Sequence, residues 1–185
     1  AYKKALAIKP TYGEAHANLA DVYRLLDKVD ESIAEYRLAT TFIKDDAEIY
    51  SKYGYMAARR AAAPGYQNYW RTAIENFEAA VRLKSDYVDY SNLGWAYYNL
   101  AQIELRDRKE AAYKANLPKA REALLKAIEL KPVPKVAAAV NLNLGMTLSD
   151  LGDYPGAIAA LKTAADLEPK WIPVMNELGL AYRKS

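Results

Sequence analysis

The sequence predicts an all-α solenoid of about ten antiparallel helices, and three observations lead to that prediction. Apolar residues are spaced three or four apart along most of the chain, as on the buried face of a helix. Glycine and proline fall where such helices would end. A residue pair that ends in a small residue recurs at a step of 34 residues, and a fixed step of that size is typical of stacked repeats. The pairs are Leu19-Ala20 and Tyr53-Gly54, then Leu144-Gly145 and Leu178-Gly179.

The stretch from Asn141 to Pro169 carries the repeated pattern most fully. Gly152 would form the turn between a first and a second helix, because glycine readily ends a helix. Asp153 would cap the second helix, and Pro155 is tolerated in its first turn. The packing positions are Leu144, Gly145, Leu148, Tyr154, Ala157, Leu161 and Ala164.

This spacing resembles the tetratricopeptide repeat. The resemblance implies a right-handed α-α superhelix, in which the first helix of each repeat (helix A) lines a concave groove and the second (helix B) lies outside. We expect a single tetratricopeptide repeat domain over residues 1–185, as a fragment of a longer chain. Its parts would be a half repeat at 1–12, repeats at 13–46, 47–86, 87–132 and 138–171, and a terminal helix at 172–185.

Two insertions lengthen the repeat step, at residues 61–66 and 101–115. The first should lie between helix A and helix B, because Pro64-Gly65 stops a helix. In the third repeat we expect helix A to run past its partner, with a charged tip near Arg106 to Glu110 and helix B beginning at Asn116. Three further residues should lengthen the link between Pro132 and Ala138.

Composition argues against several function classes. The net charge is +3, from 26 basic and 23 acidic residues that are interspersed, so no basic stripe indicates a nucleic-acid partner. There is no cysteine, which leaves the compartment open, and the one histidine, His16, is predicted to pack between helices. We expect no metal site, no cofactor, no catalytic site and no membrane insertion, because no phosphate loop, activated nucleophile or long apolar run occurs.

The helix A position before each repeated residue pair is the first candidate partner-binding site. It carries Asn18, Lys52, Asn92 and Asn143 in successive repeats. Asparagine has a donor and an acceptor on one side chain, so it can pair with both groups of a peptide bond. Such a ladder resembles the groove of the glycosyltransferase that adds N-acetylglucosamine to intracellular proteins. The alternative is that asparagine here only supports helix geometry. Lys52 would meet an acidic group of the partner.

Three residues further along helix A stand Asp21, Tyr55, Trp95 and Met146. The last three would anchor apolar side chains of a partner, or would simply pack between repeats. Some tetratricopeptide repeats hold acidic chaperone tails in a carboxylate clamp of lysine and asparagine. Glu14, Ala17 and Asp21 stand at the matching positions, which argues against that ligand.

The insertions offer a second candidate surface. If they project from the same edge of the solenoid they would be neighbours, and their aromatic side chains could form an exposed ridge. These are Tyr66, Tyr69, Trp70 and Tyr113. The alternative is that Trp70 and its tyrosines fold back to cover the lengthened hairpin.

The function predicted is a non-catalytic scaffold that holds an extended or helical segment of a partner protein in its concave groove. One alternative is a head-to-tail homo-oligomer, stacked through apolar residues at the two ends. These are Tyr2, Ala5 and Leu6 at one end and Leu178 and Tyr182 at the other. Another alternative is the substrate-recruiting arm of a larger enzyme, such as a protein glycosyltransferase.

Overall fold

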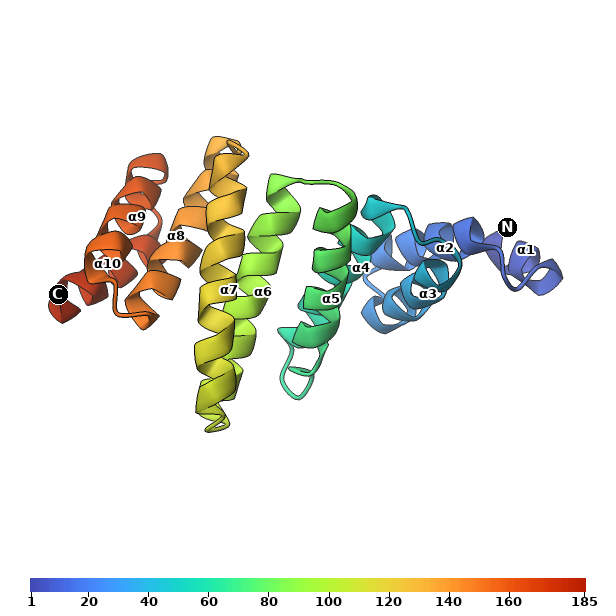
Figure 1. Cartoon of the computed structure of the whole chain (residues 1–185). Helices are drawn as coiled ribbons and strands as arrows, with labels where there is room; N and C mark the ends of the chain where they lie inside the picture. Colours follow the sequence, from blue (N-terminus) through green and yellow to red (C-terminus); the bar gives the residue numbers. More distant parts are fainter. The chain divides into compact units, whose positions relative to one another are not determined.

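The computed structural model describes residues 1–185 and contains ten α-helices and no β-strand (Figure 1). The predicted all-α class is therefore confirmed. Contacts within the chain group it into two compact units, Ala1–Ser85 and Asp86–Ser185. The extent of the single domain and the repeat boundaries stay predictions, and the two units are described one at a time.

The first unit consists of five helices. They are α1 (Tyr2–Ile8), α2 (Gly13–Leu25), α3 (Val29–Phe42), α4 (Ala47–Ala61) and α5 (Tyr69–Leu83). Helix α2 packs on α3, α3 on α4 and α4 on α5. Tyr36, Ala39 and Met56 are fully buried at the centre of this unit, and Ile33 and Tyr53 join them. The small and apolar residues three or four apart in the sequence thus form one continuous core across consecutive helices.

The second unit also has five helices. They are α6 (Tyr87–Arg106), α7 (Glu110–Glu129), α8 (Pro134–Asp150), α9 (Tyr154–Leu167) and α10 (Ile172–Lys184). Helix α6 pairs with α7 and α8 with α9, while α10 packs on both α9 and α8. Leu124, Val140, Leu161 and Val174 are buried in a core shared by α7 to α10. Each helix B is thus held between the helix A before it and the helix A after it.

The turn at Gly152 and the cap at Asp153 are as predicted. Gly152 has a φ of 82°, in the left-handed region that glycine adopts without strain. This lets the amide of Asp153 donate to the Leu148 carbonyl and close α8. The Asp153 carboxylate then accepts from the Gly156 amide at 3.0 Å, and Pro155 lies in the first turn of α9. A left-handed residue followed by a capping aspartate therefore reverses the chain between α8 and α9.

His16 packs in the seam between helices, as predicted. It is buried, and its ring lies 6.0 Å from the Phe42 ring. Its Nδ1 is 2.6 Å from Glu35 Oε2 and its Nε2 is 2.8 Å from the Pro10 carbonyl oxygen. The ring therefore ties α2 to α3 and to the segment before α2.

The third helix pair corrects a prediction. Helix B does not begin at Asn116 beneath an overlong helix A; α6 and α7 are both 20 residues long and meet at a charged turn, Asp107–Lys109. Pro118 consequently lies inside α7, although an interior proline removes a backbone hydrogen bond. The added turns are joined by Asn116, whose Nδ2 donates to buried Glu104 Oε2 at 2.6 Å. The insertion thus lengthens the pair symmetrically, as Figure 1 shows.

The link before the fourth pair is also shorter than predicted. Helix α8 already begins at Pro134, so residues 135–137 are helical instead of lengthening the link. Proline is favoured at the first helical position because its fixed φ suits a helix and its missing amide is not needed there. The insertion at 61–66 does lie between two helices, since α4 ends at Ala61 and α5 starts at Tyr69.

Candidate partner-binding faces

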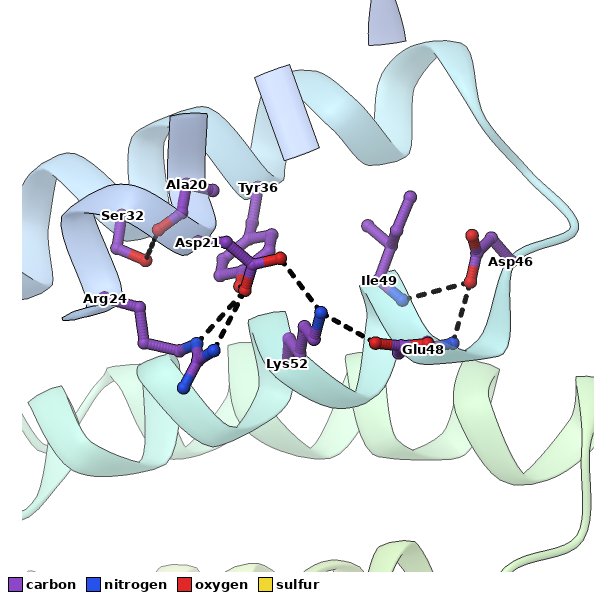
Figure 2. Close-up of polar contacts among 9 residues, drawn as sticks. All are labelled: Ala20, Asp21, Arg24, Ser32, Tyr36, Asp46, Glu48, Ile49 and Lys52. Atoms are coloured by element: carbon purple, nitrogen blue, oxygen red, sulfur yellow. Dashed lines mark hydrogen bonds and ion pairs between the residues drawn. The ribbon is translucent and has the colours of Figure 1, made fainter. Parts of the chain in front are cut away.

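Asp21 of α2 is the centre of a polar network in the first unit (Figure 2). One carboxylate oxygen accepts from the Tyr36 hydroxyl at 2.8 Å and from Arg24 Nε at 3.2 Å. The other accepts from Lys52 Nζ of α4 at 2.9 Å. The same ammonium group lies 2.7 Å from Glu48 Oε1. Three helices are thus joined through one carboxylate on the helix A face.

The network sets the charge of this face. Burial alone would raise the pKa of Asp21, but the hydrogen bonds from Lys52 and Tyr36 outweigh it and hold the pKa below its usual value. Burial, followed by Asp21, raises the pKa of the Tyr36 hydroxyl, which therefore stays a donor. Lys52 was expected to meet an acidic group of a partner. Its ammonium is instead bound by two carboxylates of this chain.

A hollow of about 210 Å³ lies over this network. Asn18 and Asp21 of α2, Tyr36 of α3 and Ile49 and Lys52 of α4 are among the residues that line it. The structure therefore brings Asn18 and Lys52 to one surface depression. Asn18 is exposed and its amide makes no hydrogen bond within the protein, so both its donor and its acceptor are available.

A second depression in the first unit adjoins this hollow. Its lining includes Glu14, Asp45, Asp46 and Glu48, with Lys84 as the one basic residue. Glu14, Asp46 and Glu48 also line the first hollow. The two depressions together therefore present more acidic than basic groups.

The second unit repeats the asparagine position. Asn92 of α6 and Asn143 of α8 are half-buried, and neither side-chain amide is hydrogen-bonded to the protein. Asp150 of α8 accepts from the Tyr98 hydroxyl at 3.2 Å and from Gln102 Nε2 at 2.7 Å, which joins α8 to α6. Sequence reasoning missed Asp150, although its place seven residues after Asn143 puts it on the same helix face.

A second carboxylate stands near Asp150. Burial, and then the charge of Asp150, raise the pKa of Glu177 on α10. Burial also raises the pKa of Tyr98, and Asp150 adds to that shift. The helix A face of this unit thus combines amides without partners with carboxylates that are partly dehydrated.

The predicted apolar anchors differ in how far they reach the surface. Tyr55 of α4 is 48% exposed. Trp95 of α6 is half-buried, and Met146 of α8 packs against the core of the second unit. Tyr55 is therefore open to a partner side chain, whereas Met146 is largely committed to internal packing.

Of the aromatic residues of the insertions, Trp70 is not available for the exposed ridge that was predicted. Trp70 is only 3% exposed, so its side chain is packed inside the lengthened α4–α5 pair. Tyr66 stays at the surface with its ring 3.3 Å from Arg60 Cζ and 6.4 Å from the Tyr69 ring. Tyr113 lies on α7, and burial followed by the charge of Asp150 raises its pKa. Whether the two insertions are neighbours stays a prediction.

None of the helices combines the length and the apolar character that crossing a membrane requires. No group of three or more histidine, cysteine, aspartate or glutamate residues is arranged to hold a metal ion.

Two segments of the chain match family models described as tetratricopeptide repeat, at residues 1–34 and 138–170. No curated protein matched the sequence. Tetratricopeptide repeats serve in general as protein-interaction scaffolds and not as catalytic units.

Solved structures show the same fold. One is the crystal structure of the protein MamA, with 22% identity, coverage of 93% of this chain and 81% of that one, and a TM-score of 0.66. A thermophilic tetratricopeptide repeat protein of Thermus thermophilus has 18% identity, coverage of 98% and 87%, and a TM-score of 0.58. PilW, a type IV pilus biogenesis factor, has 18% identity, coverage of 99% and 79%, and a TM-score of 0.61. The two family-model matches identify tetratricopeptide repeats in this chain, and the solved structures show that it has the fold of such repeat proteins.

Proposed function

We propose that the chain is a non-catalytic scaffold whose helix A faces bind a segment of a partner protein. One observation carries the proposal: Asn18, Asn92 and Asn143 occupy equivalent positions on α2, α6 and α8, and none of their amides is hydrogen-bonded within the protein. By contrast, the side chains of Asn76, Asn99 and Asn141 each donate to a backbone carbonyl four residues earlier on their own helix. The three ladder asparagines are thus free to pair with another chain.

An extended partner segment suits these asparagine amides better than a helical one. Peptide groups inside a helix are already paired with one another, whereas those of an extended segment still need partners. An asparagine side chain offers one donor and one acceptor, which is what one exposed peptide group requires. Tyr55, exposed on α4, would add contact with an apolar side chain of the segment.

The charge of the hollow in the first unit limits which side chain of the partner segment can bind there. Because Asp21 and Glu48 already bind Lys52, that lysine does not select an acidic group. Glu14 and Asp46 add negative charge to the hollow. A neutral or basic side chain at this point of the partner segment therefore fits better than an acidic one.

The test is a peptide-display selection against the chain, run beside the triple variant Asn18→Ala/Asn92→Ala/Asn143→Ala. Each lost hydrogen bond is worth about 0.5–1.5 kcal/mol, so we expect the triple variant to bind the selected peptides at least about tenfold more weakly. The affinity is measured by fluorescence anisotropy. Alanine favours helix more than asparagine does, so the variant should fold.

The matched control is Asn68→Ala. Asn68 is an exposed asparagine without a side-chain hydrogen bond, and it lies outside the ladder. This variant should bind as the parent does. Equal binding by the parent and the triple variant would rule out the asparagine ladder and direct attention to Tyr66 and Tyr69.

Self-association is a second candidate, favoured by the exposure of Tyr2 on α1 and Tyr182 on α10. Against it, both ends are basic, with Lys3 and Lys4 on α1 and Arg183 and Lys184 on α10. Light scattering over a dilution series tests this candidate: a monomer at every concentration excludes head-to-tail stacking.

A role as the recruiting arm of a larger enzyme stays a hypothesis that the sequence of flanking domains would test.

A further inference from the structure

Asp150 is the last residue of α8, and only one of its two carboxylate oxygens is used within the chain. Oδ2 accepts from both the Tyr98 hydroxyl and the Gln102 amide of α6. Oδ1 accepts no hydrogen bond, and no lysine or arginine of this chain forms an ion pair with the carboxylate. Two neutral donors therefore hold Asp150 in place and leave its charge and one oxygen without a partner.

Asp21 in the first unit shows the opposite arrangement. Its oxygens accept from the Tyr36 hydroxyl and from two cations of the chain, Arg24 and Lys52. The charge of Asp21 is therefore matched within the first unit. Asp150 has the neutral hydroxyl and amide donors but no corresponding cation.

The last turn of α8 also lacks the positive charge that the first helix of every other repeat carries there. The basic residues of these last turns are Arg24 on α2, Arg59 and Arg60 on α4, Arg106 on α6, and Arg183 and Lys184 on α10. In α8 this turn has no basic residue and ends on Asp150. A helix C-terminus favours cations because its last carbonyl groups carry partial negative charge. The end of α8 therefore adds a full negative charge to a partial one.

The carboxylate of Glu177 on α10 increases the negative charge near Asp150. Burial, and then the charge of Asp150, raise the pKa of Glu177, and Lys184 offsets only part of that rise. Both α6 and α10 pack on α8, so the first helices on either side of Asp150 are present in the structure. Neither forms an ion pair with Asp150. Its unmatched charge thus does not arise from an absent neighbour in the row of first helices.

Asn143, Met146 and Asp150 follow one another along one face of α8. Their spacing of three and then four residues places them one above another on the helix. The Asn143 amide has no hydrogen bond within the chain, and Met146 is half-buried. At about 1.5 Å per residue, the first and last positions are about 10 Å apart along the helix axis. An amide, an apolar side chain and a carboxylate therefore stand in that order on α8.

We propose that this face of α8 selects a lysine or arginine side chain of the bound segment, and that Asp150 sets the preference. A peptide group of the segment pairs with Asn143, the apolar stem of the basic side chain lies on Met146, and its charged head donates to Asp150 Oδ1. Lysine and arginine suit this row because their stems lie along apolar surface while their charged heads reach polar groups. The inference rests on the function proposed above, since the asparagines must hold the segment.

The first test is a peptide-display selection against the 185-residue chain and, in parallel, against Asp150→Asn. Asparagine keeps an oxygen that can accept from Tyr98 and Gln102, so the variant should retain the circular dichroism spectrum of the parent. Peptides selected by the parent should carry lysine or arginine at one fixed position, and those selected by Asp150→Asn should not. Asp166→Asn is the matched control, because Asp166 is exposed on α9 and forms no side-chain hydrogen bond or ion pair.

A double-mutant cycle then measures the contact between the basic side chain and Asp150. A selected peptide is made with an acetylated N-terminus, so that only its side chains carry positive charge. It is compared with the same peptide in which the basic residue is replaced by methionine, which keeps an apolar stem. By fluorescence anisotropy, the replacement should weaken binding to the parent by at least about fivefold and binding to Asp150→Asn by much less. Added salt should reduce this difference, because charges near the surface are screened.

The outcomes separate this inference from the proposed function. Peptides that need the three ladder asparagines but have no basic position, or that bind Asp150→Asn as tightly as the parent, would overturn the role of Asp150 alone. Peptides that bind the triple asparagine variant as tightly as the parent would overturn both, because the inference needs Asn143. Selection of no peptide at all would do the same. If Asp150→Asn does not fold, equal binding of the basic and methionine peptides to the parent rejects the inference.

Discussion

Helices α8 and α10 carry the same leucine–glycine pair, 34 residues apart, in opposite surroundings. Gly145 of α8 is covered by Leu161 of α9, whereas Gly179 of α10 faces open space. The repeated motif therefore specifies a surface shaped for a neighbouring helix. Whether that surface becomes core or stays exposed depends on the helix that follows. Matched substitutions on α8–α9 and on α10 should therefore have different effects on stability.

The largest difference is expected for Leu161→Ala. Leu161 is 1% exposed and fills the space above Gly145, so its truncation should lower the free energy of unfolding by about 2–5 kcal/mol. Leu180→Ala on α10 is the matched change, since Leu180 is 36% exposed; it should cost no more than about 0.5 kcal/mol. Urea denaturation followed by circular dichroism measures both. Similar losses would mean that α10 is covered after all.

Next come Gly145→Ala and Gly179→Ala, which should change stability in opposite directions. At Gly145 the added methyl group meets Leu161, and overpacking costs about 1–3 kcal/mol, which exceeds the gain of about 1 kcal/mol in helix propensity. At Gly179 there is no steric cost, so the free energy of unfolding should rise by about 0.5–1 kcal/mol. The same urea titrations report both variants. A stabilised Gly145→Ala protein would contradict the packing described here.

The smallest effect is expected at Glu177, where α10 approaches Asp150 of α8. Burial, and then Asp150, raise the pKa of Glu177 above its usual value. An acid with a raised folded-state pKa is easier to protonate in the folded protein, so stability rises as the pH falls through that pKa. The gain in stability is complete once the pH is below the pKa of glutamate in the unfolded chain, about 4.3.

Glu177→Gln should therefore be slightly more stable than the parent at neutral pH, and the two proteins should converge below about pH 4. Thermal unfolding across a pH series measures this. Glu168→Gln is the control, because Glu168 is exposed and lies just beyond α9. If the unfolding temperature of Glu177→Gln changes with pH as that of the parent does, then Glu177 and Asp150 do not interact. Helix α10 would then lie farther from α8 than described.

Local patterns were enough to predict most of the elements. Asp153 and Pro155 define the start of α9 because a cap and an early proline are short-range features. The same reasoning was wrong for α7, because Asn116-Leu117-Pro118 imitates that start. The bond between Asn116 and the buried Glu104 belongs to the added turns of two helices, and sequence spacing does not reveal such a pairing.

For the candidate site too, the sequence predicted some features and not others. The repeat register identified Asn18, Lys52, Asn92 and Asn143 from their positions alone. It did not show that Lys52 is already bound by Asp21 and Glu48, since those ion pairs depend on side chains of α2 and α4 meeting in space. Nor did it show that Trp70 is buried, because an aromatic residue beside a loop can turn either way.

By itself, the sequence determined the helices, their pairing in repeats and the positions that face along helix A, because periodicity, caps and small residues act over a few residues or one repeat. The tertiary structure decided which of those positions are available. Contacts between helices fill the space above Gly145, and they neutralise Lys52 while leaving the amide of Asn18 unpaired. Availability depends on what packs opposite a side chain, and that partner lies on another helix.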